Sequence, residues 1–143
     1  MTYLLDVNVL IALMDRSHVH HEAAHGWFGE LKADRWATCP MTENAVVRIM
    51  GSPSYVNWPG SLLIVARLLQ RMTASPGHVF WADDIGLFSC PEVDVDRMLA
   101  PAQVTDSYLL ALAVVHGGKL ASFDRRLITD AVRHGASALQ LVG

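Results

Sequence analysis

The chain contains very little cysteine. Cys39 and Cys90 are its two cysteines among 143 residues, and they form no Cys-x-x-Cys pair. Two cysteines are too few for the disulfide framework of a small secreted domain, and a zinc module built from paired cysteines is excluded. We therefore expect both thiols to be reduced, as they are in cytoplasmic proteins.

Targeting signals and long apolar runs are absent as well. The first residues, Met1–Asp6, carry no basic region and reach an acid at once, which is not the pattern of a signal peptide. The apolar stretch Leu4–Met14 is interrupted by Asp6 and Asn8 and is shorter than the roughly 20 residues that span a bilayer. The sequence therefore predicts a soluble, cytoplasmic protein without a membrane segment.

Basic residues are in deficit. Fourteen acids face eleven Lys and Arg residues, which gives a net charge of −3. This charge lacks the basic footprint of a duplex-DNA reader, so we expect no sequence-specific DNA binding by this chain alone.

The composition, 52% hydrophobic and 17% charged, excludes disorder as the main state. The length predicts one domain that spans residues 1–143.

Short strand-like runs alternate with helix-like runs along the chain. This alternation predicts an α/β fold in which helices flank a mostly parallel central sheet. The expected strands are Tyr3–Leu5, Trp36–Cys39, His78–Trp81, Lys119–Phe123 and Ala138–Val142. The expected helices are Val7–Met14, His20–Ala33, Pro40–Met50, Ser61–Thr73, Gln103–His116 and Arg125–His134. Residues 83–98 show no clear periodicity.

Four acids stand at the starts of predicted helices. They are Asp6, Glu43, Asp106 and Asp124, and two of them, Asp6 and Asp124, directly follow predicted strands. The carboxyl ends of parallel strands are where ligand sites form in such sheets. An acid at a helix start also caps free N–H groups and complements the helix dipole, and for any one of the four this structural explanation suffices.

The apolar neighbours of these acids favour a shared chemical role. A carboxylate among apolar residues is expensive to desolvate, and several converging carboxylates repel one another. A divalent cation relieves both penalties, and hard oxygen ligands suit Mg²⁺ or Mn²⁺. Such an ion is held by a few carboxylates together with substrate phosphates, as in metal-assisted phosphodiester cleavage.

Four segments resemble the PIN-domain ribonucleases, and among them the VapC-type toxins of bacterial type II toxin–antitoxin systems. The opening Leu4–Leu13 is similar to the start of these proteins. The order and spacing of all four segments match those of the family along essentially the whole chain. The other matching segments are Thr42–Asn44, Val104–Ala113 and Leu120–Leu127. The ordered set of four is more specific than any single segment.

The resemblance implies an endoribonuclease that depends on Mg²⁺ or Mn²⁺. It maps Asp6, Glu43, Asp106 and Asp124 onto the acidic cluster of the family, with Asp6 and Asp106 as direct metal ligands and the other two helping to bind metal or to position the nucleophile. Asn8, where the family often has Thr or Ser, would support the metal ligands.

Further expectations concern supporting residues and partners. Ser122 lies two residues before Asp124 and is a further polar candidate, although a residue of an alternating strand gives the same pattern. Arg125 and Arg126 are candidates for contacts with RNA phosphates, since Arg suits bidentate phosphate binding. The family implies an RNA substrate, a homodimer and a cognate antitoxin protein.

Three alternatives stay open. The segment His21-Glu22-Ala23-Ala24-His25 matches the H-E-x-x-H signature of zinc hydrolases, with Glu43 as a possible third ligand. This interpretation leaves the three aspartates without a role, and Gly26 weakens the helix that must hold both histidines. A PIN nuclease with housekeeping duties in RNA processing would carry the same acids, and a non-enzymatic binding module would lack the metal site.

Overall fold

One parallel sheet organises the molecule. The computed structural model describes all residues 1–143, and its five strands run in the order β3-β2-β1-β4-β5. The strands are β1 (Thr2–Leu5), β2 (Arg35–Thr38), β3 (His78–Phe80), β4 (Lys119–Ser122) and β5 (Leu139–Leu141). Every neighbouring pair is parallel, which confirms the α/β prediction.

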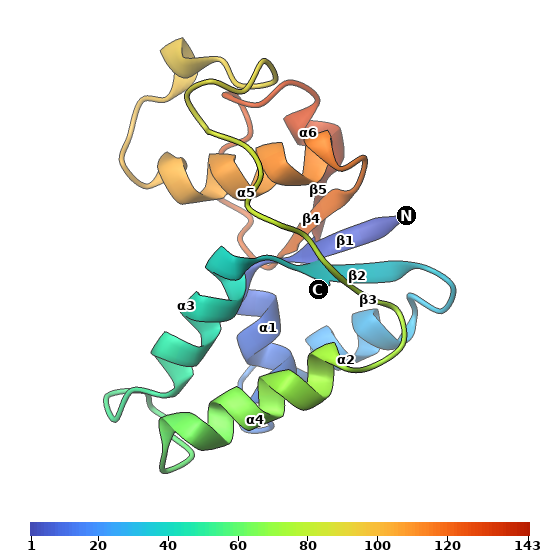
Figure 1. The fold of residues 1–143 in the computed structure, drawn as a ribbon, viewed down its shortest axis with the longest axis vertical. Helices are drawn as coiled ribbons and strands as arrows, with labels where there is room; N and C mark the ends of the chain where they lie inside the picture. The colour runs from blue at the N-terminus through green and yellow to red at the C-terminus, as the bar shows by residue number, and fades with distance from the viewer.

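Helices cover both faces of this sheet, and Figure 1 shows the two layers on opposite sides of it. One face carries α1 (Val7–Met14), α2 (His21–Gly29), α3 (Pro40–Met50) and α4 (Leu62–Thr73), and the other carries α5 (Gln103–Val115) and α6 (Gly135–Ala138). Successive strand residues alternate between the faces. Leu4 therefore joins the core under α5, whereas Leu5 joins the core under α1 and α3.

Local sequence signals explain where the helices on the first face begin. The side chain of Asp6 caps α1 by accepting the Val7 N–H. Pro40 occupies the first turn of α3, where its missing N–H has no helical partner to lose. The Ser61 hydroxyl accepts the Ile64 N–H at 3.1 Å and caps α4.

The strand order creates a switch point between β1 and β4. From β1 the chain proceeds to β2 and β3 on one side, and after returning to β4 it proceeds to β5 on the other. The helices that follow β1 and precede β4 lie on opposite faces of the sheet. Such a switch point leaves a crevice at the carboxyl ends of the two strands, which is the usual ligand site of an open parallel sheet.

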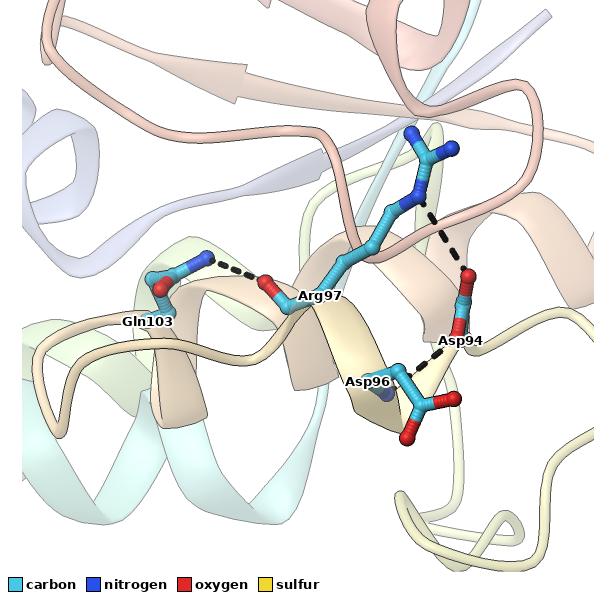
Figure 2. Close-up of polar contacts among 4 residues, drawn as sticks. All are labelled: Asp94, Asp96, Arg97 and Gln103. Carbon is cyan, nitrogen blue, oxygen red and sulfur yellow. Dashed lines mark hydrogen bonds and ion pairs between the residues drawn. The ribbon is translucent and has the colours of Figure 1, made fainter.

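The segment before α5 is ordered by polar side chains rather than by periodicity. A short 3₁₀ helix, η1 (Val95–Arg97), is capped by Asp94, which accepts the Asp96 N–H at 3.1 Å and pairs with the Arg97 Nε at 3.3 Å (Figure 2). The buried carboxamide of Gln103 donates to the Arg97 carbonyl at 3.2 Å (Figure 2). Its Oε1 accepts the N–H groups of Leu99 and Ala100, which lie just before α5, so Gln103 fixes the start of α5.

The predicted helix over Arg125–His134 is wrong. The backbone of this segment instead pairs with the loop before η1, through an isolated bridge between Val93 and Val132. The Asp94 N–H donates to the Ala131 carbonyl at 2.8 Å. Asp124 therefore opens a turn, in which its Oδ1 accepts the Arg126 N–H at 2.8 Å, rather than a helix.

The short helix α6 over Gly135–Ala138 was not predicted, and the other predicted elements differ from the structure only at their ends. The helix predicted over His20–Ala33 forms as the shorter α2, which ends at Gly29. None of the helices combines the length and apolarity that crossing a bilayer requires.

Candidate active site

Asp6 lies at the switch point with both carboxylate oxygens held. Its Oδ1 accepts the Val7 N–H at 2.8 Å, and its Oδ2 accepts the Ser122 hydroxyl at 2.7 Å. The residue is only 9% exposed. The first contact is the ordinary cap of a helix, but the second joins the ends of β1 and β4, so Asp6 is fixed more firmly than capping requires.

Ser122 is the centre of a small hydrogen-bond network at the end of β4. Its hydroxyl donates to Asp6 and accepts the Asn8 Nδ2–H and the Asp124 N–H, each at 3.1 Å. The Asn8 Oδ1 in turn accepts the Phe123 N–H at 3.2 Å. The structure thus places Asn8 and Ser122 between Asp6 and Asp124, although Ser122 also belongs to a buried strand.

Three aspartates from distant parts of the chain interact electrostatically at this edge. Burial raises the pKa of Asp6, which the hydrogen bonds from Ser122 and Val7 partly offset and the charge of Asp124 reinforces. Burial, together with the charges of Asp6 and Asp124, raises the pKa of Asp106. Because Asp106 forms no hydrogen bond in compensation, its ionised form is destabilised in this site.

Glu43 occupies a neighbouring position rather than the centre of this trio. It lies in the first turn of α3, and its Oε2 accepts the Thr38 hydroxyl at 2.6 Å. The same hydroxyl lies 2.7 Å from the His78 Nε2. No group of three or more His, Cys, Asp or Glu side chains is close enough to hold one metal ion as the side chains stand.

The alternative zinc motif lies on α2, on the α1 side of the sheet. His21 places its Nδ1 2.7 Å from the Ala12 carbonyl, and its ring lies 4.5 Å from the ring of His25. Both histidines line a groove of about 380 Å³ between α1, α2 and α4. Glu43 is engaged by Thr38 instead, so no third acidic ligand completes a zinc site with this pair.

The two predicted RNA-binding arginines follow Asp124 on the surface. Arg125 donates from Nη2 to the carbonyl of Gly143 at 2.8 Å, and Arg126 is exposed. Neither forms an ion pair with an acid. Neither guanidinium group is therefore paired with a side-chain carboxylate, which leaves both able to contact phosphates.

Sequence reasoning missed Thr38 and His78. Thr38 ends a buried strand, where a β-branched residue is unremarkable, and His78 opens the short strand β3. Their relation to Glu43 depends on the pairing of β2 with β3, in which Trp36 lies opposite His78. The parallel pairing of two strands 40 residues apart has no signature in a single sequence.

The PIN domain family matches residues 3–132, a span that contains all four predicted acids. The chain belongs to this family. It is 42% identical to Ribonuclease VapC44 of Mycobacterium tuberculosis over 132 residues, which cover 92% of each chain. It is 44% identical to Ribonuclease VapC39 of the same organism over 131 residues, 92% of this chain and 94% of that one. These relatives place it among the VapC-type PIN proteins.

A solved structure shows the same PIN fold at much lower sequence similarity. VapBC2 from Rickettsia felis, crystallised bound to a DNA fragment from the promoter, aligns with a TM-score of 0.60 at 11% identity. The alignment covers 88% of this chain and 90% of that chain. The predicted PIN-like sheet with flanking helices is therefore confirmed by the structure and by the family match.

Proposed function

We propose that this VapC-type PIN protein is the toxin of a toxin–antitoxin system and cleaves RNA with the help of a divalent cation. The observation that carries the proposal is the convergence of Asp6, Asp106 and Asp124 at the switch point, where the charge of Asp124 helps to raise the pKa of Asp6 and the charges of Asp6 and Asp124 help to raise the pKa of Asp106. Three buried or half-buried carboxylates without a basic partner are unfavourable in themselves. A bound cation makes such an arrangement favourable.

The donor set fits Mg²⁺ or Mn²⁺. All candidate ligands are carboxylate oxygens, and no cysteine or histidine lies among the trio, which is the ligand chemistry of hard cations. We assign Asp6 and Asp106 as direct ligands, with Asp124 and Glu43 binding directly or through water. When bound, the cation would supply an activated water and would neutralise charge on the leaving oxygen.

The remaining residues would hold these ligands and the substrate. Ser122 fixes one oxygen of Asp6 and, through the Asp124 N–H, the turn that carries Asp124. Asn8 supports the Ser122 hydroxyl from α1. We assign Arg125 and Arg126 to contacts with RNA phosphates beside the cleaved bond, since phosphate contacts position a nucleic acid without selecting its sequence.

Partner proteins belong to the same proposal. The solved structure that shares the fold is VapBC2, and the VapC relatives are named as ribonucleases. We infer that this chain binds a cognate antitoxin, forms a homodimer and acts in the cytoplasm, where its RNA substrate is found. A small antitoxin-like reading frame beside the gene distinguishes a toxin from a PIN nuclease of housekeeping RNA processing.

The test is cleavage of purified RNA by matched variants. Asp6→Asn keeps the shape and the helix cap but removes the charge, and Asp130→Asn makes the same change at an exposed acid. We expect cleavage with Mg²⁺ or Mn²⁺ by the wild type and by Asp130→Asn, and none after chelation. Asp6→Asn should lose roughly 100-fold or more, because even supporting residues of a metal site cost 10–100-fold. Wild-type cleavage by a folded Asp6→Asn variant would contradict the proposal.

A further inference from the structure

A buried threonine joins Glu43 to a histidine of the neighbouring strand. Thr38 is fully buried at the end of β2, and its hydroxyl contacts the Glu43 Oε2 at 2.6 Å and the His78 Nε2 at 2.7 Å. Both distances lie within the normal ranges for hydrogen bonds of these types, toward their short ends. Three side chains from α3, β2 and β3 are therefore connected in a line that ends on one carboxylate oxygen.

The number of available protons fixes the direction of this line. A threonine hydroxyl has one proton to donate, and an ionised carboxylate can only accept. With Thr38 donating to Glu43, its oxygen accepts from His78 in the tautomer that carries the ring proton on Nε2, and the contact of the His78 ring with the Thr73 backbone competes for that proton. The order of donation is His78 to Thr38 to Glu43, and a chain of hydrogen bonds in one direction strengthens each of its members.

The sheet itself holds the first donor. Trp36 and Thr38 are two residues apart in β2 and point to the same face of the sheet. His78 lies opposite Trp36 across the parallel ladder, and the two rings lie 4.6 Å apart. The imidazole thus packs against the Trp36 ring while its Nε2 contacts the Thr38 hydroxyl.

We propose that Thr38 and His78 are positioning residues that hold Glu43 in the orientation in which it serves the active site. The line fixes Oε2 and leaves the Glu43 Oε1 without a donor, available to a cation or to its bound water. This inference rests on the proposed function, because it assigns no role to the line apart from Glu43. It explains why a half-buried carboxylate separate from the aspartate trio is held by a buried hydroxyl.

The first measurement uses variants that remove or keep the hydroxyl. Thr38→Val has the same shape without the proton, whereas Thr38→Ser keeps the proton. We expect Thr38→Val to weaken Mn²⁺ binding, measured by calorimetry on the complete chain, and to lower kcat for RNA cleavage, each by roughly 10–100-fold. KM for RNA should change little, and Thr38→Ser should restore both quantities to near wild-type values.

His78 is tested by the same logic. His78→Gln can still donate a proton to Thr38, whereas His78→Leu cannot. We expect Gln to retain more Mn²⁺ affinity and a higher kcat than Leu. Nitrogen-detected NMR of the wild type should show the proton of His78 on Nε2, and Thr38→Val should shift that resonance. A proton on Nδ1 alone would overturn the inferred direction.

Glu43→Gln separates failure of this inference from failure of the proposed function. If Glu43→Gln cleaves RNA at the wild-type rate, Glu43 has no place in the active site and both assignments of Glu43 are wrong. If Glu43→Gln is impaired while folded Thr38→Val binds Mn²⁺ and cleaves as the wild type does, only the positioning role is overturned. If the role is correct, adding Thr38→Val to Glu43→Gln causes little further loss, because both changes act through one carboxylate.

Discussion

Neutralising Asp106 should stabilise the metal-free protein while abolishing its activity. Asp106 is half-buried, forms no hydrogen bond, and has a pKa raised by burial and by the charges of Asp6 and Asp124. The folded state therefore binds a proton on Asp106 more readily than the unfolded state does. The stability that this group contributes is complete below its ordinary pKa of 3.8 and is lost as pH rises through the raised value.

Asp106→Asn removes the loss of stability that ionisation of Asp106 causes at neutral pH. Partly exposed charge pairs contribute about 0.2–1 kcal/mol each, and Asp106 has two like-charged neighbours, so the release amounts to about 1 kcal/mol. For a chain of this length that corresponds to a rise in Tm of roughly 3–5 °C without metal. The gain should disappear below about pH 4, where the wild-type carboxyl is protonated.

Divalent cations should make the wild type more stable than Asp106→Asn. A ligand at 100 times its Kd stabilises the folded state by about 2.7 kcal/mol, or roughly 10 °C in Tm. We expect this rise for the wild type with Mn²⁺ in thermal melts followed by circular dichroism, and little rise for Asp106→Asn. The exposed Asp130→Asn should behave as the wild type does. An Asp106→Asn variant that is less stable without metal, or that gains as much from Mn²⁺ as the wild type does, would refute the reasoning.

Three further predictions concern the surroundings of the site. Ser122→Ala should lower the free energy of unfolding in urea by about 1–3 kcal/mol and reduce RNA cleavage, because it leaves the Asn8 amide without its acceptor; unchanged values would exclude a supporting role. Tyr55→Phe should cost about 1.5–3 kcal/mol at pH 7, because the Tyr55 hydroxyl donates to buried Asp15. Burial would raise the pKa of Asp15, but the hydrogen bonds that it accepts lower the pKa below its ordinary value of 3.8. The stability that the Tyr55–Asp15 hydrogen bond contributes is therefore present above pH 3.8 and is lost as pH falls through the lowered pKa. A stability difference between Tyr55→Phe and the wild type that persists at lower pH would contradict this assignment. His25→Ala should leave RNA cleavage unchanged, and a tenfold loss would favour the zinc alternative.

Local patterns predicted most of the fold because each depends on neighbouring residues. The helix over Val7–Met14 has the predicted bounds, because the Asp6 cap and Asp15 are both visible in the sequence. The helix over Pro40–Met50 also has its predicted bounds, since Pro40 suits a first turn and Gly51 follows the end. Such signals are sufficient where no distant segment competes for the backbone.

The predictions were wrong where distant segments compete. Residues 125–134 have a helical composition, but their backbone groups bind the loop around Val93 and Asp94, about 40 residues away. The candidate site follows the same division. The gathering of Asp6, Asp106 and Asp124 followed from their places at the ends of strands and helices. The hydrogen bond from Thr38 to Glu43 depends on strand pairing and side-chain geometry that only the structure shows.

The central claim is tested most directly in living cells. Mapping RNA 5′ ends after brief expression of the wild type and of Asp6→Asn compares the intact and the altered acidic site on the whole RNA population. The account predicts new, discrete 5′ ends together with growth arrest for the wild type, and neither for Asp6→Asn at equal protein levels. The same new ends in both samples, or none in the growth-arrested wild type, would contradict it.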